Sequence, residues 1–365
     1  MVRSLGVEEE LLLVDAGSCE PRAVAGAVLD GLGPVVKDGP GGELVAELQQ
    51  EQLETNTSPC ESLDGLRDEL RGWRGRASAL ARTQGVEVAA LATSPVAVSP
   101  RLTSDDRYRW MAEAFGITAR EHLTCGCHIH VEVGSDEEGV AVIDRIQPWL
   151  APLLALSANS PFWQGQDTGF AGYRYQVFGR WPTAGPPQAF GSAEGYRRAV
   201  SELLASGVML DEAMMYFDAR LSAAYPTVEV RVCDVCPDIE DALLLAALVR
   251  ALVVTASRDW TAGRPAPDIG VPLLQLAAWR ACRSGLDGPL LHPRTQRPAT
   301  AREVVEAVVE HTEAALKESG DLDTVRAGID RLLTVGTGAH WQRTVYGERG
   351  PTAVVREAIS RTLLF

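Results

Sequence analysis

A segment close to the start of the chain places three carboxylates inside an otherwise apolar stretch. Residues 5–15 read Leu-Gly-Val-Glu-Glu-Glu-Leu-Leu-Leu-Val-Asp. In a β-strand, Glu8 and Glu10 share one face, and aliphatic residues continue on both faces, which predicts a strand covered on both sides. Neighbouring carboxylates on a covered strand repel each other and lose hydration, a cost that bound cations offset. The alternative for any isolated Glu-x-Glu pair is a solvated strand end.

A second predicted strand carries two histidines with the same alternation. Residues 126–133 read Gly-Cys-His-Ile-His-Val-Glu-Val, so that His128, His130 and Glu132 lie on one face. Two imidazoles that point the same way suit a metal ion or a phosphate. A pair of partly buried, hydrogen-bonded histidines is the alternative.

Two other segments add carboxylates. Glu229 and Arg231 share a face of the most regular strand pattern in the chain, Thr-Val-Glu-Val-Arg-Val-Cys-Asp. They form either a structural ion pair or a site in which Glu229 holds a metal ion and Arg231 stabilises phosphoryl charge. Glu47 and Glu54 flank the turn into a strand predicted to end before a proline, with Glu51 between them. These three glutamates would also line one face of a solvated helix.

The cysteines offer a different metal site. Cys125 and Cys127 lie at the start of one predicted strand, and Cys233 and Cys236 lie at the end of another. Four thiolates from two strand ends can form a structural zinc site, although the first spacing is tight for one. Small buried hydrophobic residues are the alternative. Seven cysteines spread over a long chain do not indicate a disulfide framework.

The charge pattern excludes several classes of protein. The net charge is −15, which argues against nucleic acid as the main partner because phosphate backbones require basic surface. Lys37 and Lys317 are the only lysines, and neither lies in a P-loop motif or fits the strand lysine of a protein kinase. If the protein handles phosphate, it must therefore do so with metal ions and arginines. No apolar run is expected to cross a bilayer, and a cytoplasmic protein is predicted.

The order of predicted elements favours one α+β domain over residues 1–365. The chain is 46% hydrophobic and shows no repeat or low-complexity linker. We expect long helices over residues 63–84, 137–157 (broken at its two prolines) and 239–258, and one helix over residues 107–122. Residues 160–191 lack periodicity and predict a long functional loop.

Taken in order, these motifs resemble those of the type 2 glutamate–cysteine ligase family, and more closely its bacterial carboxylate–amine ligases. The similarity rests on Glu-x-Glu at residues 8–10, Glu47 followed by Glu-Thr-Asn-Thr-Ser-Pro-Cys at 54–60, Gly-Cys-His-Ile-His-Val at 126–131 and residues 227–234. Residues 157–174, 180–182, 279–288 and 336–343 also match. Gly169 stands where some relatives have an arginine, which leaves the acidic substrate open.

The resemblance implies a glutamine-synthetase-like catalytic fold, with a curved, mainly antiparallel sheet flanked by helices. It also implies a role for each matched side chain. The implied metal ligands are Glu10, Glu47 and Glu54 in one cluster and Glu8, His128 and Glu229 in a second, nearer the nucleotide phosphates. The implied catalytic residues are Arg231 and His130, and the implied substrate or ATP contacts are Arg174, Arg280, Arg283 and Arg343.

The activity implied by the resemblance is ATP-dependent ligation of a carboxylate to an amine through an acyl phosphate, with Mg²⁺ or Mn²⁺ as the metal. The expected partners are an amino-acid carboxylate and an amine, without nucleic acid or membrane, and the expected assembly is a homo-oligomer such as a dimer. Two alternatives remain open from the sequence. One is a phosphagen-kinase-like phosphotransferase on the same fold, and the other is a zinc-dependent hydrolase or a structural zinc protein.

Overall fold

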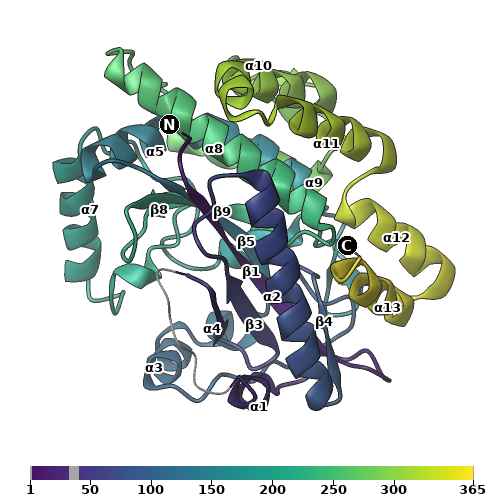
Figure 1. The fold of residues 1–365 in the computed structure, drawn as a ribbon. Helices are drawn as coiled ribbons and strands as arrows, with labels where there is room; N and C mark the ends of the chain where they lie inside the picture. Colours follow the sequence, from purple (N-terminus) through teal and green to yellow (C-terminus); the bar gives the residue numbers. More distant parts are fainter. Residues whose placement is uncertain (1, 33–40, 365) are drawn as a thin grey trace.

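The computed structural model describes residues 2–32 and 41–364, and an antiparallel sheet lies at its centre (Figure 1). Within these residues, seven strands form the sheet in the order β2-β3-β1-β5-β9-β8, with β4 paired to the far end of β1. The strands are β1 (Leu5–Asp15), β2 (Glu43–Ala46), β3 (Gln52–Asn56), β4 (Val86–Ala89), β5 (Gly126–Glu132), β8 (Ala219–Leu221) and β9 (Thr227–Asp234). The expected α+β class with an antiparallel sheet is confirmed.

Strand β1 occupies the middle of this sheet, as its double-sided apolar pattern predicts. It pairs with β3 along one edge and with β5 and then β4 along the other. The register sets Glu8 opposite His128 and Glu10 opposite Glu54. Because side chains alternate along a strand, all four point to the same face of the sheet.

Three long helices cover the opposite face: α2 (Leu63–Thr83), α5 (Asp136–Leu156) and α8 (Ile239–Thr261). Ser62 caps α2 by accepting a hydrogen bond from the backbone of Gly65. Helix α8 is apolar on all sides because it lies between the sheet and the outer pair α10 (Ala301–Ser319) and α11 (Leu322–Val335) (Figure 1). The main hydrophobic core therefore lies between the sheet and these helices.

One charged pair lies inside the helix-covered side. Glu9 points away from its two neighbouring glutamates and meets Arg74 of α2, and both side chains are 0% exposed. Arg74 donates to both carboxylate oxygens of Glu9, at 2.8 and 2.6 Å, and to the main-chain oxygen of Cys236 at 2.6 Å. The bidentate contact makes this buried pair a fixed link between β1 and α2.

The remaining elements surround the sheet. They are α1 (Ala25–Asp30), α3 (Asp106–Phe115), α4 (Ile117–Glu121), α6 (Tyr173–Phe178), α7 (Ala193–Ala205), the 3₁₀ turn η1 (Glu212–Met214), α9 (Val271–Ser284), α12 (Gly338–Arg349), α13 (Pro351–Thr362) and the short hairpins β6 (Phe162–Trp163)–β7 (Gln166–Asp167) and β10 (Leu290–Leu291)–β11 (Pro298–Ala299). Helices α12 and α13 lie beyond β4 (Figure 1).

Four sequence-based expectations need correction. Helix α5 continues through Pro148 and Pro152, because burial on nearly all sides holds the turns that each proline weakens. By length and composition α5 also has the features of a membrane span, contrary to expectation, but 94% of that window is buried inside the protein, as in a core helix. The helix expected over residues 107–122 is divided at Gly116, where φ is +57°. The long loop at 160–191 contains α6 and the β6–β7 hairpin.

Candidate active site

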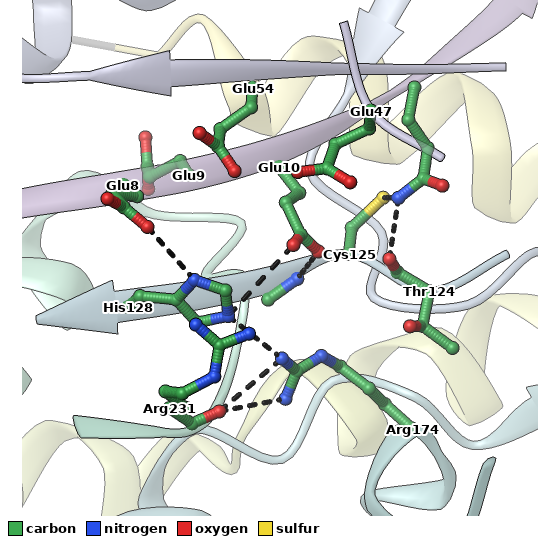
Figure 2. Close-up of polar contacts among 12 residues, drawn as sticks. Glu8, Glu9, Glu10, Glu47, Glu54, Thr124, Cys125, His128, Arg174 and Arg231 are labelled. Atoms are coloured by element: carbon green, nitrogen blue, oxygen red, sulfur yellow. Dashed lines mark hydrogen bonds and ion pairs between the residues drawn. The ribbon is translucent and has the colours of Figure 1, made fainter. Parts of the chain in front are cut away.

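The polar face of the sheet forms the floor of a pocket of about 300 Å³. Six of the residues singled out in the sequence line it: Glu8, Glu10, Glu47, Glu54, His128 and Arg231. Figure 2 shows the carboxylates of β1, β3 and the turn after β2 gathered above His128 and Arg231. Glu8, Glu10, Glu54 and His128 come from strands that are distant in sequence, and they meet here because they lie on the same face of paired strands.

The first cluster consists of Glu8, His128 and Glu229. Nδ1 of His128 lies 3.1 Å from Oε2 of Glu8 and 4.0 Å from Oε1 of Glu229. One donor atom from each of the three residues falls within 4.8 Å of the others. The structure thus brings together the set that the resemblance implies, and its role in holding a metal ion stays a prediction.

The second cluster consists of Glu10, Glu47 and Glu54, whose donor oxygens also lie within 4.8 Å of one another. Glu10 and Glu54 face each other across the β1–β3 pairing, and Glu47 follows β2 directly. Asn56 donates to Glu54 at 2.9 Å, and the backbone N–H of Gly126 donates to Glu10 at 2.6 Å. A solvated helix face was the alternative for Glu47, Glu51 and Glu54. It is wrong, because Glu54 lies on β3 and the other two lie in the connection between β2 and β3. Glu51 is buried elsewhere, against the backbone of Arg101.

The two clusters differ in their electrostatics. Burial and the charges of Glu47 and Glu8 raise the pKa of Glu54 well above its usual range, and burial also raises the pKa of Glu10. Burial works in the same direction on Glu8, but hydrogen bonds with His128 and His130 outweigh it and lower the pKa of Glu8. Burial and the repulsion between neighbouring carboxylates therefore favour retained protons in the second cluster. Carboxylate oxygens with one imidazole fit a hard divalent cation.

Arginines surround the carboxylate of Glu229. Arg220 on β8 donates to Glu229 at 2.7 Å, and Arg231, which lies on β9 together with Glu229, also pairs with it. Burial works against ionisation of Glu229, but Arg231 and Arg220 lower its pKa well below the usual range. The ion-pair interpretation of Glu229 and Arg231 is thus correct as geometry, and Arg231 also lines the pocket.

Sequence reasoning missed several residues of the pocket wall. Arg107 on α3 lines the pocket and pairs with Asp211, and Arg220 lies directly opposite Glu229 in the β8–β9 pairing. The hairpin turn before Thr227 was the available signal for Arg220, because it implies a partner strand for β9. The aromatic wall comes from Tyr108, Phe178, Trp181 and Tyr216.

The other predicted arginines lie outside this pocket. Arg174 is 1% exposed, and its guanidinium lies 3.4 Å from Nε2 of His128, on the side of the ring opposite Glu8 (Figure 2). Arg343 donates to Asp167 at 2.8 and 2.9 Å, and Arg283 donates to the main-chain oxygen of Gly169. Arg280 is half-buried on α9. Direct contact of these four arginines with substrate or ATP stays a prediction.

His130 lines a second, more apolar pocket of about 200 Å³ at the start of β1. Its Nε2 lies 3.1 Å from Oε1 of Glu8, and Tyr225 borders the same space. Burial tends to lower the pKa of His130, but the hydrogen bond with Glu8 raises it above its usual value. Glu8 lines both pockets and so lies at their boundary.

The cysteines do not form a metal site. Across residues 2–32 and 41–364, the groups of side chains close enough to hold a metal ion contain glutamate and histidine only. Cys127, Cys233 and Cys236 belong to the hydrophobic core beneath the sheet. Burial raises the pKa of the Cys127 and Cys236 thiols well above their usual value, which disfavours the thiolate that zinc requires.

Known proteins share this chain's sequence and fold. The model of the family described as "Glutamate-cysteine ligase family 2(GCS2)" matches residues 4–361. The chain belongs to this family. It is 50% identical over 365 residues to "Putative glutamate--cysteine ligase 2-1" of Paenarthrobacter aurescens. This alignment covers 99% of this chain and 95% of the relative. The chain is 51% identical over 362 residues to the protein of the same name from Streptomyces avermitilis, with 99% of each covered.

The solved structures extend the match to the fold. A glutamate–cysteine ligase of Francisella tularensis, solved in complex with AMP, superposes with a TM-score of 0.70 over 100% of this chain and 90% of that one, at 14% identity. The expected family and fold are therefore confirmed. The expectation that the chain is an ATP-dependent carbon–nitrogen ligase is confirmed at the level of the family.

Proposed function

We propose that this protein is a glutamate–cysteine ligase-like enzyme that joins the side-chain carboxylate of glutamate, or of a related acid, to an amine such as that of cysteine, using ATP and Mg²⁺. The observation that carries the proposal is the pair of carboxylate clusters held side by side on one face of the sheet. Two groups of hard oxygen donors next to arginines suit a nucleoside triphosphate bound through metal ions.

The lining of the two pockets supports nucleotide binding in one and substrate binding in the other. The smaller pocket is mostly apolar and bordered by Tyr225, which suits a nucleotide base. The larger pocket combines Arg107, Arg220 and Arg231 with the carboxylate clusters, which suits an amino acid with its own carboxylate. Glu8 lies between the two, where the phosphates would pass from one to the other.

The proposed chemistry has two steps. A carboxylate oxygen of the acid attacks the γ-phosphorus of ATP, the bond to the β–γ bridging oxygen breaks, and ADP leaves. The amine nitrogen then attacks the acyl carbon, inorganic phosphate leaves, and the nitrogen loses a proton to give the amide. Arg231 lies beside the clusters, where its guanidinium would stabilise the charge of the transferring phosphoryl group.

The metal ions would be held by the two clusters. Glu8, His128 and Glu229 would hold one, and Glu10, Glu47 and Glu54 the other. When bound, such ions neutralise phosphate charge and orient the phosphoryl group. Arg220 and Arg231 already orient Glu229, so that this ligand is in place before a cation binds.

The test is ADP release with ATP and Mg²⁺, screened over single amino acids and pairs of carboxylate and amine, with Glu54→Gln as the control. Release that needs both substrates and disappears in the control supports the ligase. A stable phosphorylated product without an amide would instead identify a phosphotransferase. No release with any pair, together with zinc that copurifies, would contradict the proposal. The homo-oligomeric state and the cytoplasmic location remain proposals that this assay does not address.

A further inference from the structure

The pairing of β5 with β9 is interrupted at His128. Cys127 pairs with Cys233 and Ile129 with Val230, so that Arg231 and Val232 both lie opposite the single residue His128. An extra residue of this kind is a β-bulge, which bends its strand and re-aims the side chains around it. Val232 and Cys233 are neighbours in sequence, yet both contribute to the hydrophobic core, whereas regular alternation would send them to opposite faces. The bulge therefore sets where the side chains of His128 and Arg231 point.

The guanidinium of Arg174 lies in this bulge. It contacts the main-chain oxygen of Arg231 at 3.4 Å from two nitrogens and that of Val232 at 3.5 Å. These contacts are long for hydrogen bonds, and the same group lies 3.4 Å from Nε2 of His128. Figure 2 shows it beneath the histidine ring, on the side opposite Glu8. The ring of Phe178, one helical turn further along α6, packs against the guanidinium groups of both Arg174 and Arg231.

The charge of Arg174 is buried without a partner carboxylate in direct contact. Among the described residues, none places a carboxylate oxygen within 4.0 Å of its nitrogens, and its Nε has no hydrogen-bond partner. Its charge still lowers the pKa values of Glu10, Asp218 and Asp234 against the larger effect of burial, which raises them. A buried arginine stays charged, so its placement is costly unless the surroundings use the charge.

The chain around Arg174 is built to hold it there. The Oγ of Ser160 accepts a hydrogen bond from the backbone N–H of Arg174 at 2.9 Å and donates one to Asp234, at the end of β9, at 2.7 Å. On the other side lies Gly126, where a Cβ atom would come within 2.7 Å of Cζ and 3.0 Å of Nε of Arg174, and closer still to a terminal nitrogen. The space over Gly126 is thus occupied by the guanidinium.

We propose that Arg174 is a positioning residue: it fills the bulge and supports the edge of the His128 ring, so that Nδ1 of His128 stays directed at Glu8 and Glu229. This role differs from the substrate contact that the family resemblance implied. The inference rests on the proposed function in one respect only, that the cluster of Glu8, His128 and Glu229 binds a divalent cation.

The test measures Mn²⁺ binding to the protein alone by electron paramagnetic resonance. Arg174→Ala removes the guanidinium, and Gly126→Ala leaves it in the chain but displaces it from the bulge. We expect both to weaken Mn²⁺ binding by roughly 10- to 100-fold, the range found when groups behind a metal ligand are removed. Guanidinium chloride, below concentrations that unfold the protein, should restore binding in Arg174→Ala and not in Gly126→Ala.

Arg250→Lys is the matched control, because Arg250 is also a buried arginine but pairs with Asp321 far from the pocket. It should bind Mn²⁺ as the wild type does. Unchanged Mn²⁺ affinity in folded Arg174→Ala or Gly126→Ala, whatever their melting temperatures, would overturn the inference while leaving the ligase proposal standing. Absence of Mn²⁺ binding to the wild type would overturn the inference and the metal-dependent mechanism together.

Discussion

The two carboxylate clusters share strand β1, yet they differ in what surrounds them. Glu8 and Glu229 are matched by histidines and arginines, which lower their pKa values despite burial. Glu10 and Glu54 mainly face burial and other carboxylates, which raise their pKa values. The first cluster is therefore stable as built, whereas the second stores repulsion that a bound cation would relieve. Loss of the same type of side chain should have opposite consequences in the two places.

The largest effect is expected on removing charge from the first cluster. Glu229→Gln leaves the guanidinium groups of Arg220 and Arg231 buried without a balancing carboxylate, and we expect the free energy of unfolding to fall by about 3–5 kcal/mol. In the metal-free protein, Glu54→Gln should cause no such loss, because it removes repulsion. Urea unfolding of both variants checks this. Equal losses in the two would show that the clusters are not electrostatically different.

The pH dependence of stability provides the second test. The raised pKa of Glu54 means that the folded protein keeps a proton that the unfolded chain releases above its ordinary value of 4.5. The unfolded chain then binds fewer protons, so the free energy of unfolding falls as the pH rises toward the folded pKa. We expect metal-free protein to lose stability over this window, Glu54→Gln to lose less, and saturating Mg²⁺ to remove the difference.

Glu8 and Glu229 should behave in the opposite way. Their lowered pKa values give a stabilisation that is present above the ordinary value of 4.5 and is lost as the pH falls through the folded pKa. Urea unfolding midpoints measured below and above pH 4.5 separate the contribution of Glu8 and Glu229 to stability from that of Glu54. A wild type whose stability rises with pH above 4.5, with the same slope in Glu54→Gln, would contradict the assignment of the second cluster.

The smallest effect is expected away from both clusters. The contact of Arg343 with Asp167 is partly exposed, so Arg343→Ala should change the free energy of unfolding by only about 0–1 kcal/mol. If Arg343 binds substrate, as the family resemblance implies, KM should rise while Mn²⁺ binding stays unchanged. Asp167→Asn is the control, since it weakens the same contact and keeps the arginine. Unchanged KM in Arg343→Ala would show that Arg343 does not bind substrate and only contacts the loop that contains Asp167.

Much of this arrangement could be predicted from the sequence because the key residues lie on strands. Strand β9 begins and ends where its alternation predicts. By the same rule Glu229 meets Glu8 and His128, and Glu54 meets Glu10. The remaining wall depends on tertiary contacts that no local pattern encodes. Arg220 lies on a strand of only three residues, and Arg107 reaches the pocket from α3.

The role of Arg174 shows a related limit. The sequence motif around Arg174 matches the family, and the resemblance implies a place in the site. The sequence does not show whether Arg174 faces the cavity or lies behind the residues that line it. The bulge at His128 is a feature of pairing between strands a hundred residues apart, and a single strand's pattern does not reveal it. The continuity of α5 has the same origin, since packing overrides the local preference of its prolines.

The buried pair of Glu9 and Arg74 has a consequence for how β1 finds its place. Three identical residues in a row make the strand ambiguous, because a shift by one residue still presents a glutamate at each of two positions. Arg74 on α2 donates hydrogen bonds to Glu9 alone among the three, and this alignment turns Glu8 and Glu10 to the opposite face. A single arginine beneath the sheet thus decides which alignment of a repetitive segment becomes the native one.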